Sequence, residues 1–105
     1  MSHFLTLFQG KRIKGRNVVV NIDGRRVMSS ALHEFDWGPG SAIPHRRTLA
    51  AGLLFHGLYL VPREALVAAY AEEIAAFPKH EFAVTGDQIK AWAEKWHKVN
   101  QHGKH

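Results

Sequence analysis

The chain has 105 residues, 46% of them hydrophobic, and no cysteine, which suits one domain with its own core and excludes disulfide bonds and cysteine-ligated metal centres. Its formal net charge is +5 with the histidines neutral, which favours an anionic partner over a cationic one. The sequence has neither an apolar run long enough for a membrane span nor the pattern of a signal peptide, so we expect a cytoplasmic protein without membrane contact.

The first 34 residues are predicted to form strands and a hairpin. Residues 17–22 contain three consecutive valines, whose branched side chains disfavour a helix and suit a strand. Asp23 and Gly24 follow, a pair that suits a two-residue hairpin turn because both positions accept a positive φ. Residues 25–28 are then the return strand. The alternation of a strand places Val18, Val20 and Ile22 on the core face.

Residues 35–44 are predicted to form an irregular loop, because they contain two glycines and two prolines. Trp37 either anchors this loop in the core or belongs to an exposed contact patch, and we expect it to be buried. Gly38, Gly40 and Ser41 are the other structural residues of the loop. Ser41 lacks the Gly-x-Ser-x-Gly context of an activated nucleophile, so we expect its hydroxyl to bond the loop backbone.

Three helices are predicted within residues 45–100, where apolar residues recur at helical spacing. Their expected extents are residues 45–59, residues 62–76 with Pro62 at the first position, and a third helix that starts from a Thr85–Gln88 capping box. Their apolar stripes predict the helical part of the core, namely Leu49, Leu53, Leu54, Leu66, Tyr70, Ile74, Phe77, Ile89, Trp92 and Trp96. Residues 81–84 are either a short edge strand or an extended linker.

These elements together predict one α+β domain over residues 1–105, in which a small N-terminal antiparallel β-hairpin sheet packs against three α-helices. The predicted parts are a strand and hairpin part (1–34), a central loop (35–44), a helical part (45–100) and a flexible polar tail (101–105).

Three segments of the chain form a recognisable combination. They are Phe8-Gln9-Gly10-Lys11-Arg12, Val18-Val19-Val20-Asn21-Ile22-Asp23-Gly24, and Phe35-Asp36-Trp37-Gly38-Pro39-Gly40-Ser41 before a Leu/Ala-rich helix. This combination resembles a family of small uncharacterised domains encoded by phages, plasmids and other bacterial mobile elements, over roughly residues 8–96. Pro39 stands where the family has an aromatic residue, and Asp36 where it has glutamate. The resemblance implies a fold and a mobile-element setting, and it implies no catalytic mechanism.

The positive charge is unevenly distributed along the chain. Residues 1–52 hold eight basic and three acidic side chains, whereas residues 53–105 hold six of each. The candidate binding residues are therefore the basic ones of the first half, Lys11, Arg12, Lys14, Arg16, Arg25, Arg26, Arg46 and Arg47. We interpret them as a basic face for nucleic acid or an acidic partner surface. The alternative is a basic surface that is merely solvated.

The central loop has two possible roles. It ends at a predicted helix N-terminus that carries Arg46 and Arg47, and backbone amides, the helix dipole and arginines all favour an anion there. The alternative is a purely structural loop. The eight histidines show no His-x-x-x-His spacing, and we find no nucleotide-binding motif, so we expect no metal, no cofactor and no enzymatic activity.

Two functions are compatible with these observations. The first is a non-enzymatic accessory protein of a phage or other mobile element, whose basic face binds nucleic acid or a host complex that handles nucleic acid. The second is a protein-binding inhibitor or adaptor, for example of a host defence system, with no direct contact to nucleic acid.

Overall fold

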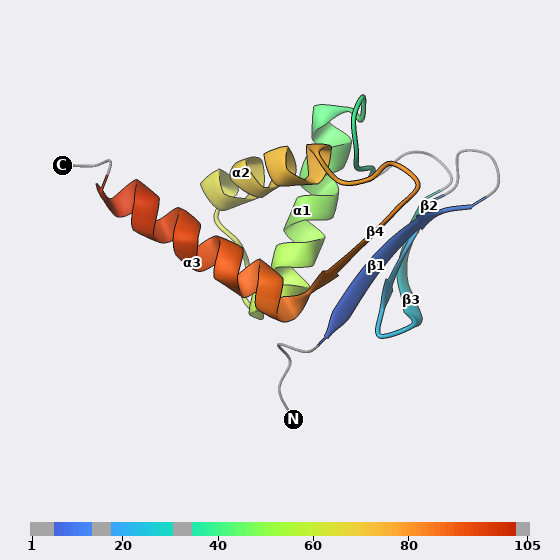
Figure 1. Ribbon diagram of the computed structural model, residues 1–105, viewed down its shortest axis with the longest axis horizontal. Helices are drawn as coiled ribbons and strands as arrows, with labels where there is room; N and C mark the ends of the chain where they lie inside the picture. Colours follow the sequence, from blue (N-terminus) through green and yellow to red (C-terminus); the bar gives the residue numbers. More distant parts are fainter. Residues whose placement is uncertain (1–5, 14–17, 31–34, 103–105) are drawn as a thin grey trace.

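The structure is a computed structural model that describes residues 6–13, 18–30 and 35–102. Its elements in chain order are β1 (Leu7–Arg12), β2 (Val18–Ile22), β3 (Arg25–Ser30), α1 (Ile43–Leu58), α2 (Glu64–Ala75), β4 (Glu81–Thr85) and α3 (Gly86–His102). The predicted α+β class, a small antiparallel sheet packed against three helices, is confirmed (Figure 1). In the described part of the chain, no helix is both long enough and apolar enough to span a bilayer.

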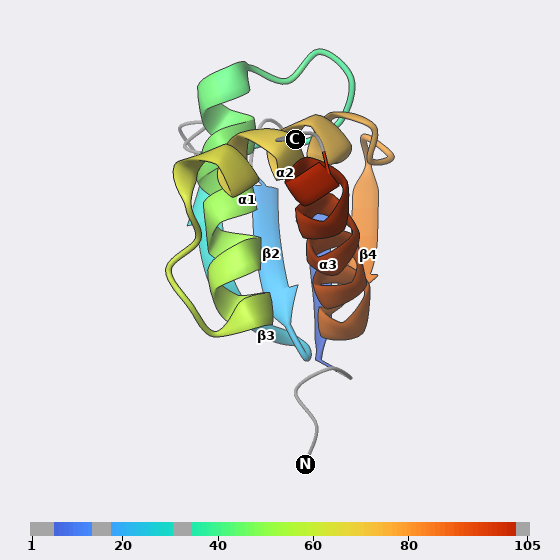
Figure 2. The same cartoon turned by 90° about the vertical axis from the view of Figure 1, so that its left-hand side faces the viewer.

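The sheet has four antiparallel strands in the order β3-β2-β1-β4, and the helices cover one of its faces (Figures 1 and 2). The hairpin forms as predicted, with Ile22 paired to Arg25 across the turn at Asp23 and Gly24. The sheet is not built from the N-terminal part alone, however. Residues 81–85 return after two helices and pair with β1, so the edge-strand interpretation of this segment is correct.

The core lies between the helices and the covered face of the sheet. Phe8, Val18 and Val20 point into it from the strands, and Leu49 and Leu53 come from α1, which packs against both α2 and α3. The predicted residues Phe77, Trp92, Trp96 and Ile22 lie at the border of the core and are only partly buried. Phe8, Phe35 and Phe82 are also buried in the core, although they were not among the predicted core residues.

Two glycines allow close packing between elements. A Cβ atom on Gly10 would come 2.0 Å from Cε2 of Phe82, so the ring of β4 lies directly over the backbone of β1. A Cβ atom on Gly57 of α1 would come 3.0 Å from Cδ1 of Ile89, where α1 and α3 meet. Side chains at these two positions would push the elements apart.

The helix ends follow the sequence signals in part. At the start of α3 the Thr85 N–H donates to Gln88 Oε1 at 2.9 Å, and the Gln88 N–H donates to Thr85 Oγ1 at 3.1 Å, which confirms the capping box. The prediction for α2 is wrong by two residues. Arg63 is the N-cap with extended dihedral angles, so Pro62 lies outside the helix rather than in its first turn.

Candidate functional site

Arg12 joins three segments at one end of the sheet. Its Nη2 donates to Asp36 Oδ1 at 2.6 Å and to the Trp37 carbonyl at 2.9 Å, and its Nε donates to the Lys79 carbonyl at 2.7 Å. The guanidinium carbon also lies 4.9 Å from the centre of the Trp37 ring. One side chain thus holds together the end of β1, the central loop and the segment before β4. Arg12 was predicted as a ligand contact, but its charge is paired with Asp36 inside the protein.

Trp37 anchors the central loop, as predicted. Its side chain is completely buried, its Nε1 donates to the Pro78 carbonyl at 3.1 Å, and its ring meets Phe82 edge to face with centroids 4.9 Å apart. The indole therefore has the polar partner that a buried tryptophan needs. The loop is docked on the segment before β4, which lies about forty residues further along the chain.

The glycines and the serine of this loop have structural roles. Gly38 has φ +88°, and its N–H donates to the Ile74 carbonyl at 2.9 Å, so a larger residue would be strained there and would crowd Lys79. The Ser41 hydroxyl is buried and donates to the Gly38 carbonyl at 2.6 Å. The expectation that Ser41 bonds the loop backbone is confirmed.

The two arginines of α1 point to different surroundings. Arg46 is largely buried, donates through Nη1 to the Ser41 carbonyl, and has Nη2 3.9 Å from Glu72 Oε2. Its Nε is buried without a hydrogen-bond partner in the described residues. Arg47 is exposed. Arg46 therefore braces the loop, whereas Arg47 is accessible to a partner.

The N-terminus of α1 adds positive potential to this end. The N-cap Ala42 provides no side-chain cap, and the first turn contains no acidic residue. The positive end of the helix dipole is therefore not offset by a carboxylate from its own first turn.

Exposed cations surround this loop at what we call the basic end. It consists of Lys11 at the end of β1, Lys79 before β4 and Arg47 at the start of α1, together with the central loop between them. Figure 1 shows that the end of β1, the beginning of β4 and the beginning of α1 all lie toward the same end of the molecule. An exposed acid, Glu81, lies opposite Lys11 in the strand register.

The structure separates those of the predicted cations that it describes. Lys14 and Arg16 lie outside the described residues. Arg25 is exposed at the opposite end of the sheet, beside the hairpin turn, and Arg26 belongs to the same strand. The candidates therefore occupy two ends of the sheet rather than one face, because β2 runs the full length between them.

Sequence reasoning missed Lys79 and the neighbouring His80. Both precede β4, and the His80 carbonyl accepts a hydrogen bond from the Arg12 N–H at 3.0 Å. If residues 81–85 are interpreted as a strand antiparallel to β1, Lys79 and His80 are predicted to lie near Lys11. The described residues contain no group of three histidine or acidic side chains that is arranged to hold a metal ion.

Comparisons with known proteins add no further constraint: the chain matches no family model, no curated protein and no solved structure. The resemblance to mobile-element domains therefore stays a prediction from the loop and hairpin sequences.

Proposed function

We propose that the protein is a non-enzymatic accessory protein that binds the phosphate backbone of nucleic acid, alone or within a host complex, through its basic end. Its setting in a phage or other mobile element rests on the sequence resemblance alone. The observation that carries the proposal is that Lys11, Lys79 and Arg47 are exposed around one loop, while the nearby Asp36 is already neutralised by Arg12. A surplus of accessible positive charge remains there for an external anion.

The shape of this end suits contact with phosphates rather than reading of bases. The cations come from a strand end, a helix start and a loop, and the exposed cation of α1, Arg47, lies in its first turns rather than along a helix face that enters a groove. Phosphate contacts position a protein and carry no sequence information. We therefore expect weakly sequence-specific binding that depends strongly on salt.

The proposal is tested by fluorescence anisotropy with a labelled DNA duplex at low salt. A triple variant, Lys11→Ser, Arg47→Ser and Lys79→Ser, should bind much more weakly than the wild type. The matched control is Arg63→Ser, Lys95→Ser and Lys98→Ser, which removes the same charge from exposed positions elsewhere. Equal losses of affinity in the two variants would show that only net charge matters, and would contradict a localised interface.

A specific observation also favours the second candidate function, a protein-binding adaptor or inhibitor. Four large apolar side chains are exposed in the last turn of α1 and directly after it, where Phe55 is 47%, Tyr59 67%, Leu60 49% and Val61 81% exposed. Apolar patches of this kind mark interaction sites for proteins. This patch lies where α1 ends, away from the basic end where α1 begins (Figure 1).

Capture from a host lysate distinguishes the two functions. Partners that are lost after nuclease treatment, and lost with the basic-end variant, support nucleic-acid binding. Partners that survive nuclease and are lost instead in a Tyr59→Ser and Val61→Ser variant support the adaptor.

A further inference from the structure

The two edges of the sheet differ in how they are protected. The outer strand β3 begins with Arg25 and Arg26 and pairs with β2 through an irregular register at Val20 and Asn21, and charges and bulges of this kind keep an edge from pairing. The other edge, β4, reads Glu-Phe-Ala-Val-Thr and contains no proline and no basic residue. It pairs with β1 in an unbroken register over its whole length. The β4 edge carries a single charge, Glu81 at its start, and its register is regular, so it is less protected than the β3 edge.

The hydrogen bonds next to β4 show which of its groups face outward. The Arg12 N–H donates to the His80 carbonyl, and the Gly86 N–H donates to the Thr6 carbonyl. Because bonded pairs alternate in an antiparallel ladder, Phe82 and Val84 direct their backbone groups to β1. The backbone groups of Glu81, Ala83 and Thr85 therefore point away from the sheet. The Thr85 N–H is already bonded by Gln88, which leaves the N–H and carbonyl of Ala83 at the centre of the edge.

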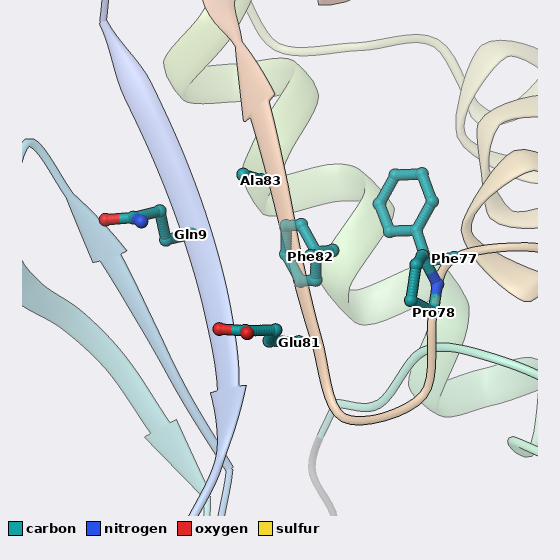
Figure 3. A pocket seen from close by; sticks show the side chains of 6 residues that line it. All are labelled: Gln9, Phe77, Pro78, Glu81, Phe82 and Ala83. Atoms are coloured by element: carbon teal, nitrogen blue, oxygen red, sulfur yellow. The ribbon is translucent and has the colours of Figure 1, made fainter.

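The outward side of β4 is open among the described residues. In Figure 2, β4 is the outermost element on the right, and α3 lies on its inner side. A pocket of about 420 Å³ runs beside the strand and is lined by Gln9, Phe77, Pro78, Glu81, Phe82 and Ala83 (Figure 3). The ring centroids of Phe77 and Phe82 lie 4.9 Å apart, and the two rings give this pocket an apolar side. An added strand would find both main-chain partners and a place for an apolar side chain.

We propose that two copies of this chain pair through β4, antiparallel and centred on Ala83, so that their sheets join into one continuous sheet. The inference is independent of the proposed nucleic-acid function. A twofold axis at Ala83 sets Phe82 opposite Val84 of the second copy and Glu81 opposite Thr85 of the second copy. No like charges face each other, and the small exposed Ala83 lies at the axis, where a large side chain would meet its own copy.

The hydrogen bonds of this pairing require no rearrangement within either copy. The Ala83 N–H of each copy reaches the Ala83 carbonyl of the other. The Thr85 carbonyl already accepts the first hydrogen bond of α3, because Thr85 is the residue directly before that helix, so the central pair of bonds at Ala83 holds the two strands. The capping bond from the Thr85 N–H to Gln88 is retained. Beyond the paired strands, the exposed Lys79 lies two residues before Glu81 and the exposed Asp87 of the second copy lies two residues after Thr85, so side chains of opposite charge flank both ends of the interface.

A strand of five residues buries less surface than the roughly 800 Å² per partner of a standard interface. We therefore expect a weak dimer, and a covalent trap is the sharpest test. The chain has no cysteine, so an Ala83→Cys variant has a single thiol. Residues that face each other in a bonded antiparallel pair have Cα atoms about 5.5 Å apart, within the range of a disulfide.

Oxidation of the Ala83→Cys variant should give a disulfide-linked dimer as the main product. The control is Glu81→Cys, on the same strand and equally exposed. In the proposed dimer its two copies lie four residue steps apart, about 14 Å along the strand, which is too far for a disulfide. Equal crosslinking of the two variants, or none in either, would overturn the proposal.

Sedimentation velocity at rising protein concentration gives a second measure without cysteine. Ala83→Pro removes the outward N–H without breaking a bond to β1, since proline is tolerated at an edge when its nitrogen faces solvent. It should abolish the concentration-dependent dimer, whereas Ala83→Ser, which keeps the N–H and a small side chain, should retain it. A wild type that stays monomeric throughout, or a dimer that is indifferent to Ala83→Pro, would exclude pairing through β4. Either result would leave the edge vacant or available to a different protein.

Discussion

At the scale of single residues, Arg12 shows how a charged side chain serves the fold instead of a ligand. Its donors are directed to Asp36, to the Trp37 carbonyl and to the Lys79 carbonyl, and its guanidinium lies over the indole. A planar guanidinium has several donors in a fixed fork, so it can hold partners from different segments at once, which a lysine ammonium cannot do as well. The central loop is therefore tied to the sheet through a polar contact next to a buried ring.

Replacing Arg12 with methionine is expected to lower the free energy of unfolding by about 2 kcal/mol, because it leaves Asp36 mostly buried without its ion-pair partner. Urea denaturation followed by tryptophan fluorescence measures the change. Adding Asp36→Asn to the same chain should recover part of the loss, since the uncompensated charge is then gone. Lys11→Met, one residue away and exposed, is the control and should change stability by less than about 0.5 kcal/mol. Equal losses at positions 11 and 12 would contradict the bracing role.

The burial of the Tyr70 hydroxyl can be tested by varying the pH. Desolvation, and secondly the negative charge of Glu73, raises the pKa of the Tyr70 hydroxyl above its ordinary value of about 10. The neutral form is favoured in the folded state, so this contribution to stability is present below about pH 10 and is lost as the pH rises further. In a Tyr59→Phe variant, Tyr70 is the only tyrosine. Its phenolate absorbance should rise only together with unfolding, as measured by circular dichroism; a rise well before unfolding would contradict the burial.

At the scale of elements, the parts that carry their own local signals were predictable. The periodic apolar stripe of α3 and its capping box predict that helix from its local sequence alone. The valines of β2 and the Asp23-Gly24 turn do the same for the hairpin. β4 has no such signal, because a five-residue strand is defined by its partner, and that partner lies some seventy residues earlier. The start of α2 was misplaced because a proline suits both a first turn and the extended residue before it.

The contact between β1 and β4 gives a prediction at this scale. Gly10→Ala places a methyl group where the Phe82 ring lies, so either the ring or the strand must move. We expect a loss of about 1–3 kcal/mol in the free energy of unfolding, measured by chemical denaturation. A second substitution, Phe82→Leu, removes the clashing ring and should cost less in the Gly10→Ala background than in the wild type. Additive losses would show that the two residues do not contact each other.

At the scale of the whole molecule, the strand directions decide where the charge lies. The sequence predicted most of the cations that the basic end exposes, and it could not assign them to an end, because that depends on the registers of β1 with β2 and β4. The antiparallel return of β4 adds Lys79 to Lys11, and the hairpin takes Arg25 to the far end. The burial of Trp37 was predictable from its own loop, whereas the pairing of Arg12 with Asp36 required the folded chain.

The placement of the cations at two ends of the sheet predicts how the binding of DNA depends on salt. If Lys11, Lys14, Arg16, Arg47 and Lys79 each make one contact with a phosphate of duplex DNA, the slope of log affinity against log salt is about −4.5, at about −0.9 per contact. Raising the salt from about 50 to about 200 mM then weakens binding roughly 500-fold. The triple basic-end variant keeps only two of these contacts, so its slope should flatten to about −1.8.

The opposite end of the sheet provides the decisive comparison. Arg25 is as exposed as the cations of the basic end, but β2 separates it from them by about 17 Å of strand. Arg25→Ser should therefore leave the slope unchanged, whereas Arg47→Ser should reduce its magnitude by about 0.9. Anisotropy titrations at four or more salt concentrations measure both slopes. If Arg25→Ser flattens the slope as much as Arg47→Ser does, the DNA contacts both ends, and the interface is the length of the sheet rather than the loop at one end of it.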